Sequence, residues 1–405
     1  MRSEKENLFD WNFIKEAFVK SFFLTSARQI SDSSVLCEWG LKFRFTPMIG
    51  ARGILMDLLW SNYFGWNNII SEEQRDNALP KTIGLKMNLS LSNIFTKLNT
   101  AVITGASSGI GKAAAIKCAQ AGMHVWLLDI DAQDLAKALP LVQSHAESGG
   151  HQHIQELVVD VSQEEQMKDA ADKVFQHEST RSVHFLMNNA AIQLGGGPLD
   201  EPMDTFRKVL DVNTLGPIIG CQAFVPRMQE KGSDGLVVNT GSKQGITAPP
   251  GNLTYNVSKA ALKTWTEGLE HELMKRRTNN GGKLFAALLI PGWVNTSIAL
   301  KEQRMRAENE GKLDEFEEDK VFFHEGKPAE GAWMPMQVID FMMKELEKGG
   351  FYVVCPDNDV DRETDKLRMT WAMQDVTKNR APLSRWHPEW KDAFAEYLKN
   401  NKKEE

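Results

Sequence analysis

The sequence predicts an α/β fold in which a doubly wound parallel sheet of seven strands carries helices on both faces. From Asn99 onward, short apolar and β-branched runs alternate with longer stretches of helical periodicity, a pattern typical of parallel sheets. A glycine-rich turn, Gly105 to Gly111, joins the first of these strands to the first helix. Ligands of such sheets bind beyond the carboxyl ends of the strands, so we expect the functional site there.

The expected strands and helices alternate along this region. The strands are Ala101–Thr104, His124–Leu128, Gln155–Val159, His184–Met187, Gly235–Asn239, Leu284–Ile290 and Phe351–Val354. The helices include Gly111–Ala121, Glu164–Glu178, Met203–Asn213, Ser258–Lys275 and Pro335–Lys348. Right-handed crossovers through the helices make the strands parallel.

Three regions are predicted along the chain. Residues 1–99 form an N-terminal extension, partly ordered, in which apolar periodicity is short-lived. Residues 100–360 form the sheet domain, with a lid at about 297–330, because Lys301–Lys320 is rich in Glu and Lys and has little apolar content. Residues 361–405 form a helical tail that ends in a charged segment.

The role of the extension is left open. Two stretches, Asp10–Lys20 and Ile54–Trp60, fit short amphipathic helices, which either pack on the main domain or dock a membrane surface or a partner protein. No basic start is followed by a long apolar run, and Asp57 and Asn62 interrupt the apolar stretch from Gly53 to Ile70. We therefore expect neither a secretory signal nor a transmembrane span.

Composition limits the classes of function. The chain has 405 residues, 42% of them hydrophobic, and a net charge of -7 without a long basic block, which argues against a nucleic-acid partner. The cysteines are far apart and form no C-x-x-C pair, namely Cys37, Cys118, Cys221 and Cys355. We expect reduced thiols, no metal site and a cytoplasmic protein. Import into an organelle through the extension stays an alternative.

The glycine-rich turn reads TGASSGIG over residues 104–111, directly after a strand and at the start of a helix. Glycine is needed where a Cβ atom would block a ligand, and N–H groups at the start of a helix bind phosphate. Asp129 ends the second strand, where a carboxylate accepts hydrogen bonds from the adenosine ribose and repels a 2′-phosphate. Ile130 follows it, so the basic residue that would welcome this phosphate is missing there, and Lys112 only partly offsets that. We expect NAD rather than NADP.

A second motif carries the chemistry. Tyr255 and Lys259 have three residues between them, and Ser242 precedes the tyrosine by thirteen positions. Hydride transfer between a secondary alcohol and a nicotinamide needs a group that exchanges the hydroxyl proton, but a tyrosine with a pKa near 10 is poorly matched to neutral pH. Lys259 lies one turn later on the same helical face, so its ammonium is expected to lower the pKa of Tyr255. Ser242 is expected to polarise the substrate oxygen.

In these motifs, from about Thr100 to Pro356, the chain resembles the short-chain dehydrogenase/reductase family, which has a Rossmann fold. Its T-G-x-x-x-G-x-G spacing differs from the G-x-G-x-x-G of other dehydrogenases. Three residues between the tyrosine and the lysine favour alcohol and carbonyl chemistry over enoyl reduction. The resemblance implies that Asn213 is a fourth catalytic residue, which holds a helix irregularity and acts in the proton relay, and that Lys259 also binds the nicotinamide ribose.

The resemblance and the expected loop positions also assign binding residues. Cofactor-binding residues would be Thr104, Gly105, Ser107, Ser108, Gly109, Ile110, Gly111, Asp129, Asp160, Val161, Asn189, Ala190, Tyr255, Lys259, Pro291, Gly292, Val294 and Thr296. Substrate-binding residues would be Ser242, Gln193 and Trp293, whereas Leu194, Phe322, Phe323 and Trp333 either extend an apolar substrate wall or pack the lid and the tail. One departure from the family is Ala191, where a glycine is common.

The leading hypothesis is an NAD-dependent oxidoreductase that interconverts a secondary alcohol and a carbonyl compound. The alternative is a dinucleotide-binding regulatory or scaffold protein with weak or no turnover. The intact set of Asn213, Ser242, Tyr255 and Lys259 argues against that alternative. The resemblance further implies a small-molecule substrate and a homodimer or homotetramer.

Overall fold

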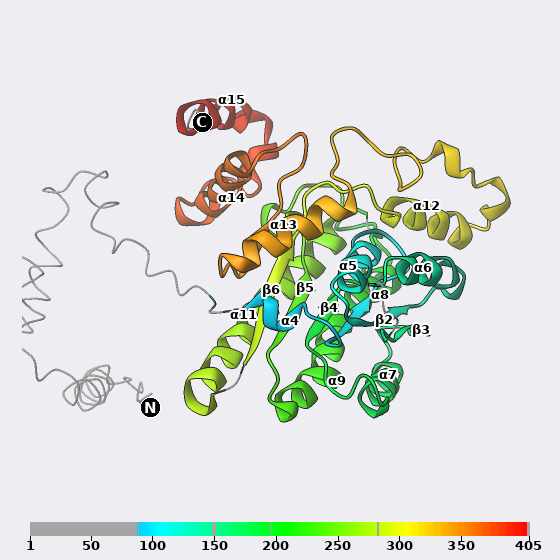
Figure 1. The fold of residues 1–405 in the computed structure, drawn as a ribbon. Helices are drawn as coiled ribbons and strands as arrows, with labels where there is room; N and C mark the ends of the chain where they lie inside the picture. The colour runs from blue at the N-terminus through cyan, green and yellow to red at the C-terminus, as the bar shows by residue number, and fades with distance from the viewer. Residues whose placement is uncertain (1–86, 88, 148–150, 195, 282, 403–405) are drawn as a thin grey trace, which may run out of the picture. The chain divides into compact units, whose positions relative to one another are not determined.

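The computed structural model describes residue 87 and residues 89–147, 151–194, 196–281 and 283–402. They form a parallel sheet in the strand order β3-β2-β1-β4-β5-β6-β7 (Figure 1). The strands are β1 Thr100–Thr104, β2 His124–Asp129, β3 Ile154–Val158, β4 Phe185–Asn188, β5 Gly235–Thr240, β6 Leu284–Ile290 and β7 Tyr352–Val354. The predicted fold class is confirmed, and each strand begins and ends within one residue of its predicted bounds.

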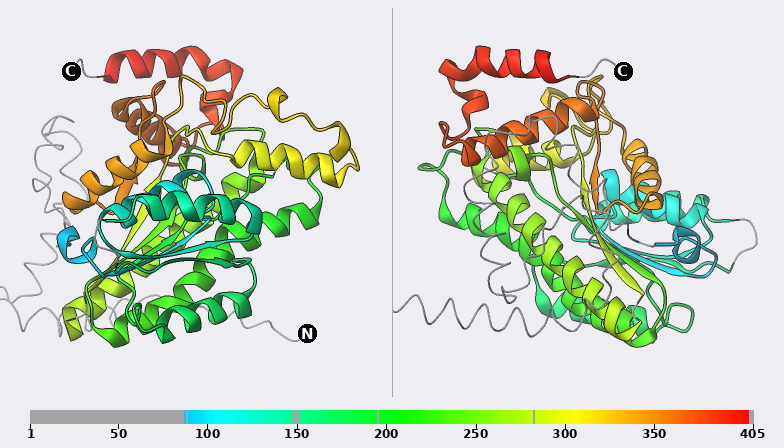
Figure 2. Two further views of the ribbon diagram at one scale, coloured as in Figure 1. Left: turned by 45° about the vertical axis from the view of Figure 1, so that its right-hand side comes forward. Right: turned by 90° about the vertical axis from the view of Figure 1, so that its left-hand side faces the viewer.

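Helices cover both faces of the sheet, as Figure 2 shows in two further views. The helices α5 Gly109–Gln120, α6 Ala132–Ser144 and α13 Pro335–Glu347 pack on one face, and α7 Glu164–Gln176, α9 Gly216–Lys231 and α11 Leu253–Asn280 pack on the other. Successive strand residues point to opposite faces. In β1, Ala101 and Ile103 belong to the first core and Val102 to the second. Burial on both faces explains why the inner strands are nearly continuous apolar runs, whereas the edge strand β3 is partly exposed and contains Gln155 and Glu156.

The strand order reverses direction next to β1, which pairs with β2 on one side and β4 on the other. The loops that follow β1 and β4 therefore diverge, and such a switch point is where doubly wound sheets bind ligands. The Thr104 hydroxyl joins the two loops, because it accepts hydrogen bonds from the N–H groups of Asn189, at 2.9 Å, and Ala190, at 3.1 Å.

Some helices differ from the prediction. The predicted helix Met203–Asn213 is α8 Met203–Leu210, which continues through a π-helical turn, Asp211–Leu215, into α9. Helix α6 is not among the predicted helices. Asp131 caps it by accepting hydrogen bonds from two backbone N–H groups, and the helix continues through Pro140. Helix α11 begins five residues before, and ends five residues after, its predicted bounds.

The predicted lid and tail are both helical. The lid contains α12 Ile298–Asn309 and the short turns Leu313–Glu315 and Glu318–Lys320. The tail contains α14 Arg362–Thr377 and α15 Lys391–Asn401, which lie at the upper left of Figure 1, while α12 lies at the upper right. Trp371 holds the tail together, since its indole N–H donates to the Ser384 hydroxyl and its ring contacts Phe394 and Tyr397.

The described residues that precede β1 pack on the sheet domain. The short helix α4 Leu91–Ile94 buries Ile94 completely in the first core. The helices predicted at Asp10–Lys20 and Ile54–Trp60, and Cys37, lie outside the described residues. Within the described part of the chain, no helix is long and apolar enough to cross a membrane. No group of three or more His, Cys, Asp or Glu side chains there could hold a metal ion.

Candidate active site

A cleft of about 1400 Å³ lies at the carboxyl ends of β1 to β6. Its walls come from the residues directly after these strands, from α12 and from the segment after it, residues 316–326. We call the part around the glycine turn and Asp129 the nucleotide half, and the part around Ser242, Tyr255 and Lys259 the catalytic half. The volume exceeds that of typical small-molecule pockets, so it has room for a dinucleotide beside a substrate.

Most of the predicted binding residues line this cleft. Those that line it are Gly105, Ser108, Gly109, Ile110, Asp129, Asp160, Val161, Asn189, Ala190, Gln193, Ser242, Tyr255, Lys259, Pro291, Gly292, Trp293, Val294 and Thr296. Thr104, Ser107, Gly111 and Asn213 do not line it. They are buried directly behind its walls and act on the shape of the cleft through hydrogen bonds and close packing.

The glycine turn is shaped by two close approaches. Gly105 has a left-handed backbone with φ of +64°, and a Cβ atom there would lie 2.8 Å from the Cα atom of Ala190. A Cβ atom on Gly111 would lie 2.1 Å from the carbonyl oxygen of Gly105. Only glycine fits these positions. The resulting cradle places the N-terminus of α5 at the cleft, where backbone N–H groups can bind an anion such as the pyrophosphate of a dinucleotide.

Asp129 is held rigidly at the end of β2. One carboxylate oxygen accepts a hydrogen bond from the Ser107 N–H at 3.0 Å, and the other accepts one from the Asp131 N–H at 3.1 Å. Asp129 is only 8% exposed, but it lines the cleft. Its charge therefore faces the end of the cleft that the ribose of an adenosine would occupy.

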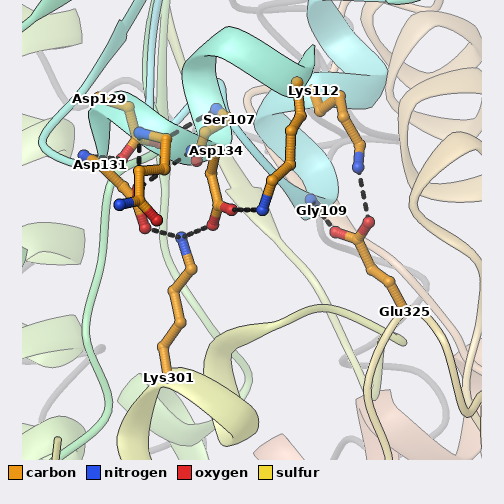
Figure 3. A network of polar contacts seen from close by, with 10 residues as sticks. Ser107, Gly109, Lys112, Asp129, Asp131, Asp134, Lys301 and Glu325 are labelled. Carbon is orange, nitrogen blue, oxygen red and sulfur yellow. Dashed lines mark hydrogen bonds and ion pairs between the residues drawn. The ribbon is translucent and has the colours of Figure 1, made fainter. Parts of the chain in front are cut away.

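Charged side chains of the lid reach into the nucleotide half (Figure 3). Lys301 of α12 lies 3.0 Å from a carboxylate oxygen of Asp134 and 3.7 Å from one of Asp131. Burial lowers the pKa of Lys301, but its hydrogen bond with Asp134 and the nearby charges of Asp129 and Asp131 raise it on balance. Lys301 thus stays a cation beside three carboxylates.

Glu325 reaches the glycine turn from the other end of the lid. One of its carboxylate oxygens accepts a hydrogen bond from the Gly109 N–H, and the other lies 2.7 Å from the Lys112 ammonium. Neither Lys301 nor Glu325 was predicted as a site residue. The only sequence signal for them was the charged composition of the lid, which does not indicate where a side chain points.

In the catalytic half, Tyr255 and Lys259 lie one turn apart on α11. Tyr255 is 8% exposed and Lys259 is 2% exposed. Burial raises the pKa of Tyr255 to about 12, against which a hydrogen bond with Ser242 acts. Burial also lowers the pKa of Lys259 to about 7. The Lys259 ammonium lies 5.6 Å from the centre of the Tyr255 ring and donates to the Thr240 carbonyl at 2.8 Å.

In this arrangement burial raises the pKa of Tyr255, and the lowering expected from Lys259 stays a prediction. Burial disfavours the phenolate of Tyr255 and the ammonium of Lys259 alike. Lys259 can favour the phenolate only while it is protonated, and a pKa of about 7 makes its protonation incomplete at neutral pH. The sequence indicated the spacing of the pair but not the degree of its burial.

Asn213 lies at the centre of the π-helical turn and is fully buried. Its amide donates to the Ile192 carbonyl at 2.8 Å and to the Ser258 hydroxyl at 3.1 Å, while its oxygen accepts from the Ile192 N–H at 2.8 Å. It thereby ties the loop after β4 to α11, on which Tyr255 and Lys259 lie. The irregularity implied by the resemblance is present, and its effect here is to position both walls of the catalytic half.

The aromatic candidates divide between the cleft and the core. Trp293 and Phe323 line the cleft and meet edge to face, with ring centres 5.4 Å apart. Phe322 is 73% exposed. Trp333 packs on Phe341 of α13, against the first core, and not in the cleft. Trp293 and Phe323 therefore remain as an apolar wall beside Gln193 and Leu194, which also line the cleft.

Lys243 connects the catalytic half to the tail. It directly follows Ser242, and its ammonium forms ion pairs with Asp357, at 3.1 Å, and with Asp365 of α14. Burial raises the pKa of Asp365 despite its pairing with Lys243. Sequence reasoning missed this buried triad because Lys243 is more than 100 positions from both aspartates.

The comparisons with known proteins agree with this architecture. Residues 99–307 match the family model described as short chain dehydrogenase. The chain is 31% identical to the protein SadH of Mycobacterium tuberculosis over 224 residues, which are 55% of this chain and 77% of SadH. It also resembles the crystal structure of a short chain dehydrogenase/reductase from Burkholderia phymatum in complex with NAD, with a TM-score of 0.59, 27% identity, and coverage of 71% of this chain and 97% of that one.

A further structure shows the fold alone. The short-chain dehydrogenase of Sphingobium yanoikuyae in complex with NADPH has a TM-score of 0.52 and 20% identity, over 69% of this chain and 96% of that one. Proteins of this fold thus bind NAD in one case and NADPH in another. The fold by itself does not determine which nucleotide this chain takes.

Proposed function

The chain belongs to the short-chain dehydrogenase family of oxidoreductases, and on that premise we propose that it interconverts a secondary alcohol and a carbonyl compound by hydride transfer, with NAD as its cofactor. The observation that carries the proposal is the meeting of Ser242, Tyr255 and Lys259 in one buried half of a cleft whose other half is a glycine cradle. The catalytic half can exchange a proton with an oxygen atom of a substrate, and the nucleotide half can hold a dinucleotide.

In this mechanism Tyr255 exchanges the proton of the substrate hydroxyl. With a pKa raised to about 12 by burial, its phenol is protonated at neutral pH and suited to donate to a carbonyl oxygen. Ser242 hydrogen-bonds the same oxygen and stabilises the charge that develops on it. A nicotinamide bound beside these residues would supply the hydride donor or acceptor and, in its oxidised form, a positive charge.

Lys259 and Asn213 support this proton transfer. When protonated, Lys259 favours the phenolate of Tyr255, so oxidation of an alcohol depends on its charge. Asn213 touches neither Tyr255 nor Lys259 but holds α11 against the loop after β4, which makes it a positioning residue. Its membership in a proton relay stays a prediction.

The preference for NAD rests on Asp129. Its fixed carboxylate matches the ribose hydroxyls of adenosine and opposes a 2′-phosphate. Lys301, a cation whose charge interacts with Asp129, is engaged by Asp131 and Asp134. A small-molecule substrate and assembly as a homodimer or homotetramer complete the proposal.

The test is an assay of NADH absorbance with secondary alcohols, sugars, steroids and carbonyl compounds, run with both cofactors and with Tyr255→Phe alongside. We expect turnover with NAD to exceed turnover with NADP. Turnover in Tyr255→Phe should fall by a factor of about 10² to 10⁴, the usual contribution of a general acid or base, while NADH binding survives. NADH binding without turnover of any compound would instead support a regulatory or scaffold protein.

A further inference from the structure

The glycine turn of this protein already holds an anion, the carboxylate of Glu325. Figure 3 shows Glu325 pointing from the lid toward Gly109 and Lys112. One oxygen accepts the hydrogen bond of the Gly109 N–H, and the other pairs with the Lys112 ammonium at 2.7 Å. The side chains of Lys112 and Glu325 are each 25% exposed, so the pair is shielded from solvent on most sides.

The N-terminus of α5 has no other partner of this kind. Ser108 precedes the helix without a side-chain capping bond, and the first turn contains no acidic residue. The free N–H groups and the dipole of a helix start attract an anion. A cation on the first turn, Lys112, adds to this attraction. Free N–H groups, a helix dipole and a nearby cation also bind the pyrophosphate of a dinucleotide. A carboxylate can take the same place because its oxygens are likewise anionic hydrogen-bond acceptors.

We propose that Glu325 is an internal competitor of the cofactor, occupying a pyrophosphate subsite formed by the Gly109 N–H and the Lys112 ammonium, from which it must be displaced when the dinucleotide binds. The inference rests on the proposed function, since it assumes that the cleft takes a dinucleotide. It assigns two roles: Lys112 binds cofactor phosphate, and Glu325 sets the affinity for the cofactor.

The lid presents Glu325 on a short, fixed turn. His324 and Lys327 exchange backbone hydrogen bonds around it, and the Gly326 N–H donates to the ring of His324 at 3.1 Å. His324 is 7% exposed and Val321 is 1% exposed, which anchors the turn in the protein. The position of Glu325 therefore does not arise from a free side chain that settles on the nearest cation.

A second ion pair holds the same lid at the adenosine end of the nucleotide half. Lys301 pairs there with Asp134 and Asp131, next to Asp129. The lid thus contacts both places that a dinucleotide needs, the ribose end through a cation and the pyrophosphate end through an anion. Of these two lid groups only Glu325 has the same sign as the cofactor, so its charge opposes the binding of a pyrophosphate at the glycine turn.

The test compares ligands with and without a pyrophosphate. ADP-ribose and adenosine binding are measured by calorimetry for the wild type and for Glu325→Gln, which keeps the size of the side chain but removes its charge. We expect ADP-ribose to bind about tenfold more tightly to the variant, because a competing closed state raises the apparent dissociation constant in proportion to its population. Adenosine affinity should change by less than about twofold.

Glu330→Gln is the matched control. Glu330 belongs to the same segment, is exposed and does not line the cleft, so its replacement removes the same charge without touching the subsite. It should leave ADP-ribose affinity unchanged. Glu325→Gln should also melt at a lower temperature than the wild type without ligand. Weaker lid packing together with tighter ADP-ribose binding is a combination that a merely structural role would not produce.

Unchanged or weaker ADP-ribose binding by a folded Glu325→Gln would overturn the proposal and make Glu325 a lid anchor. If the variant does not fold, Glu325→Asp replaces it. The shorter carboxylate cannot reach Gly109 and Lys112 together, so ADP-ribose binding should again tighten, and a failure to do so would count against competition. If neither wild type nor variant binds ADP-ribose, the proposed function itself fails, which separates the two conclusions.

Discussion

The two halves of the cleft are built by different means. In the nucleotide half, charges face one another across the lid, as in the pairs of Lys301 with Asp134 and of Glu325 with Lys112. In the catalytic half, Lys259 and Asn213 are buried and bond neutral partners, the Thr240 carbonyl and the Ile192 backbone. The lid side of the nucleotide half is held by partly exposed ion pairs, whereas Lys259 and Asn213 in the catalytic half are held by buried hydrogen bonds.

Because of this difference, substitutions in the two halves should change different properties of the protein. Partly exposed ion pairs are weak and readily exchanged for other partners, so the nucleotide half can open and trade its own carboxylate for a phosphate. Buried hydrogen bonds are costly to leave unmade, so the catalytic half is rigid, and burial sets its proton affinities. Changes in the first half should act on binding, and changes in the second on rate and pH dependence.

The largest effect is expected from a substitution in the glycine turn, because this part of the nucleotide half is as rigid as the catalytic half. In Gly111→Ala, the new methyl group would lie 2.1 Å from the Gly105 carbonyl oxygen and 2.7 Å from the Asn189 amide nitrogen. Since a backbone atom cannot give way cheaply, the free energy of unfolding should fall by about 3 kcal/mol. Urea unfolding measures this loss, and ADP-ribose affinity should fall at least about tenfold.

Gly268→Ala is the control for the helical preference of alanine. Gly268 lies in α11, and a Cβ atom there would meet nothing within 4 Å, so alanine should raise the free energy of unfolding by about 0.5 to 1 kcal/mol. Equal effects of the two substitutions would show that the close approach at Gly111 does not constrain the turn.

The second prediction tests burial as the determinant of the catalytic half. The pKa of Lys259 is about 7 in the folded protein against an ordinary value of 10.5. Between these values the unfolded chain binds more protons than the folded one, so Lys259 makes stability rise with pH. Below pH 7 the full cost of burying this amine is present. Lys259→Met removes this contribution and leaves the buried cysteines in place.

Thermal unfolding of the wild type and of Lys259→Met from pH 7 to pH 9.5 measures the contribution of Lys259 to stability. The melting temperature of the wild type relative to Lys259→Met should rise by several degrees over this range, because lowering the pKa from 10.5 to about 7 changes the free energy of unfolding by about 3 kcal/mol between these pH values. Taking the difference between the proteins cancels the buried cysteines, whose raised pKa values act in the opposite sense. A constant difference across the range would mean that Lys259 keeps its ordinary pKa.

The sheet could be predicted from the sequence because most strands are short apolar runs that end at a polar or glycine-containing turn, and the edge strand β3 still carries Ile154, Leu157 and Val158. Helix bounds depended on features with weaker sequence signals. Helix α6 was not predicted because Pro140 lies inside it and proline argues against a helix. Asp131 nevertheless starts the helix, since its side chain accepts two backbone hydrogen bonds of the first turn. The resemblance at Asn213 implied an irregularity at the π-helical turn Asp211–Leu215, but it did not indicate that α8 continues through this turn into α9.

The candidate site was predictable where its residues are close together in the chain. The glycine turn and the pair of Tyr255 and Lys259 are local patterns. Glu325 and Lys112 are 213 positions apart, and the segment that carries Glu325 has no periodicity from which a side-chain direction follows. The burial that lowers the pKa of Lys259 is likewise a property of the packed domain and has no sequence signature.

The smallest effect is expected from replacing Asp129, whose carboxylate is proposed to face the ribose of the cofactor. Asp129→Asn keeps the size of the side chain and one acceptor oxygen, but it removes the charge that opposes a 2′-phosphate. The ratio of kcat/KM for NAD to that for NADP should fall about tenfold, which corresponds to about 1.4 kcal/mol. Asp134→Asn is the matched control, because it removes the same charge beside Lys301 but not at the end of β2. If both variants shift the ratio equally, the net charge around Lys301 decides the cofactor. If only Asp129→Asn shifts it, the position of the carboxylate at the strand end decides, and the nucleotide half discriminates by a fixed hydrogen-bonding group although its lid is held by exchangeable ion pairs.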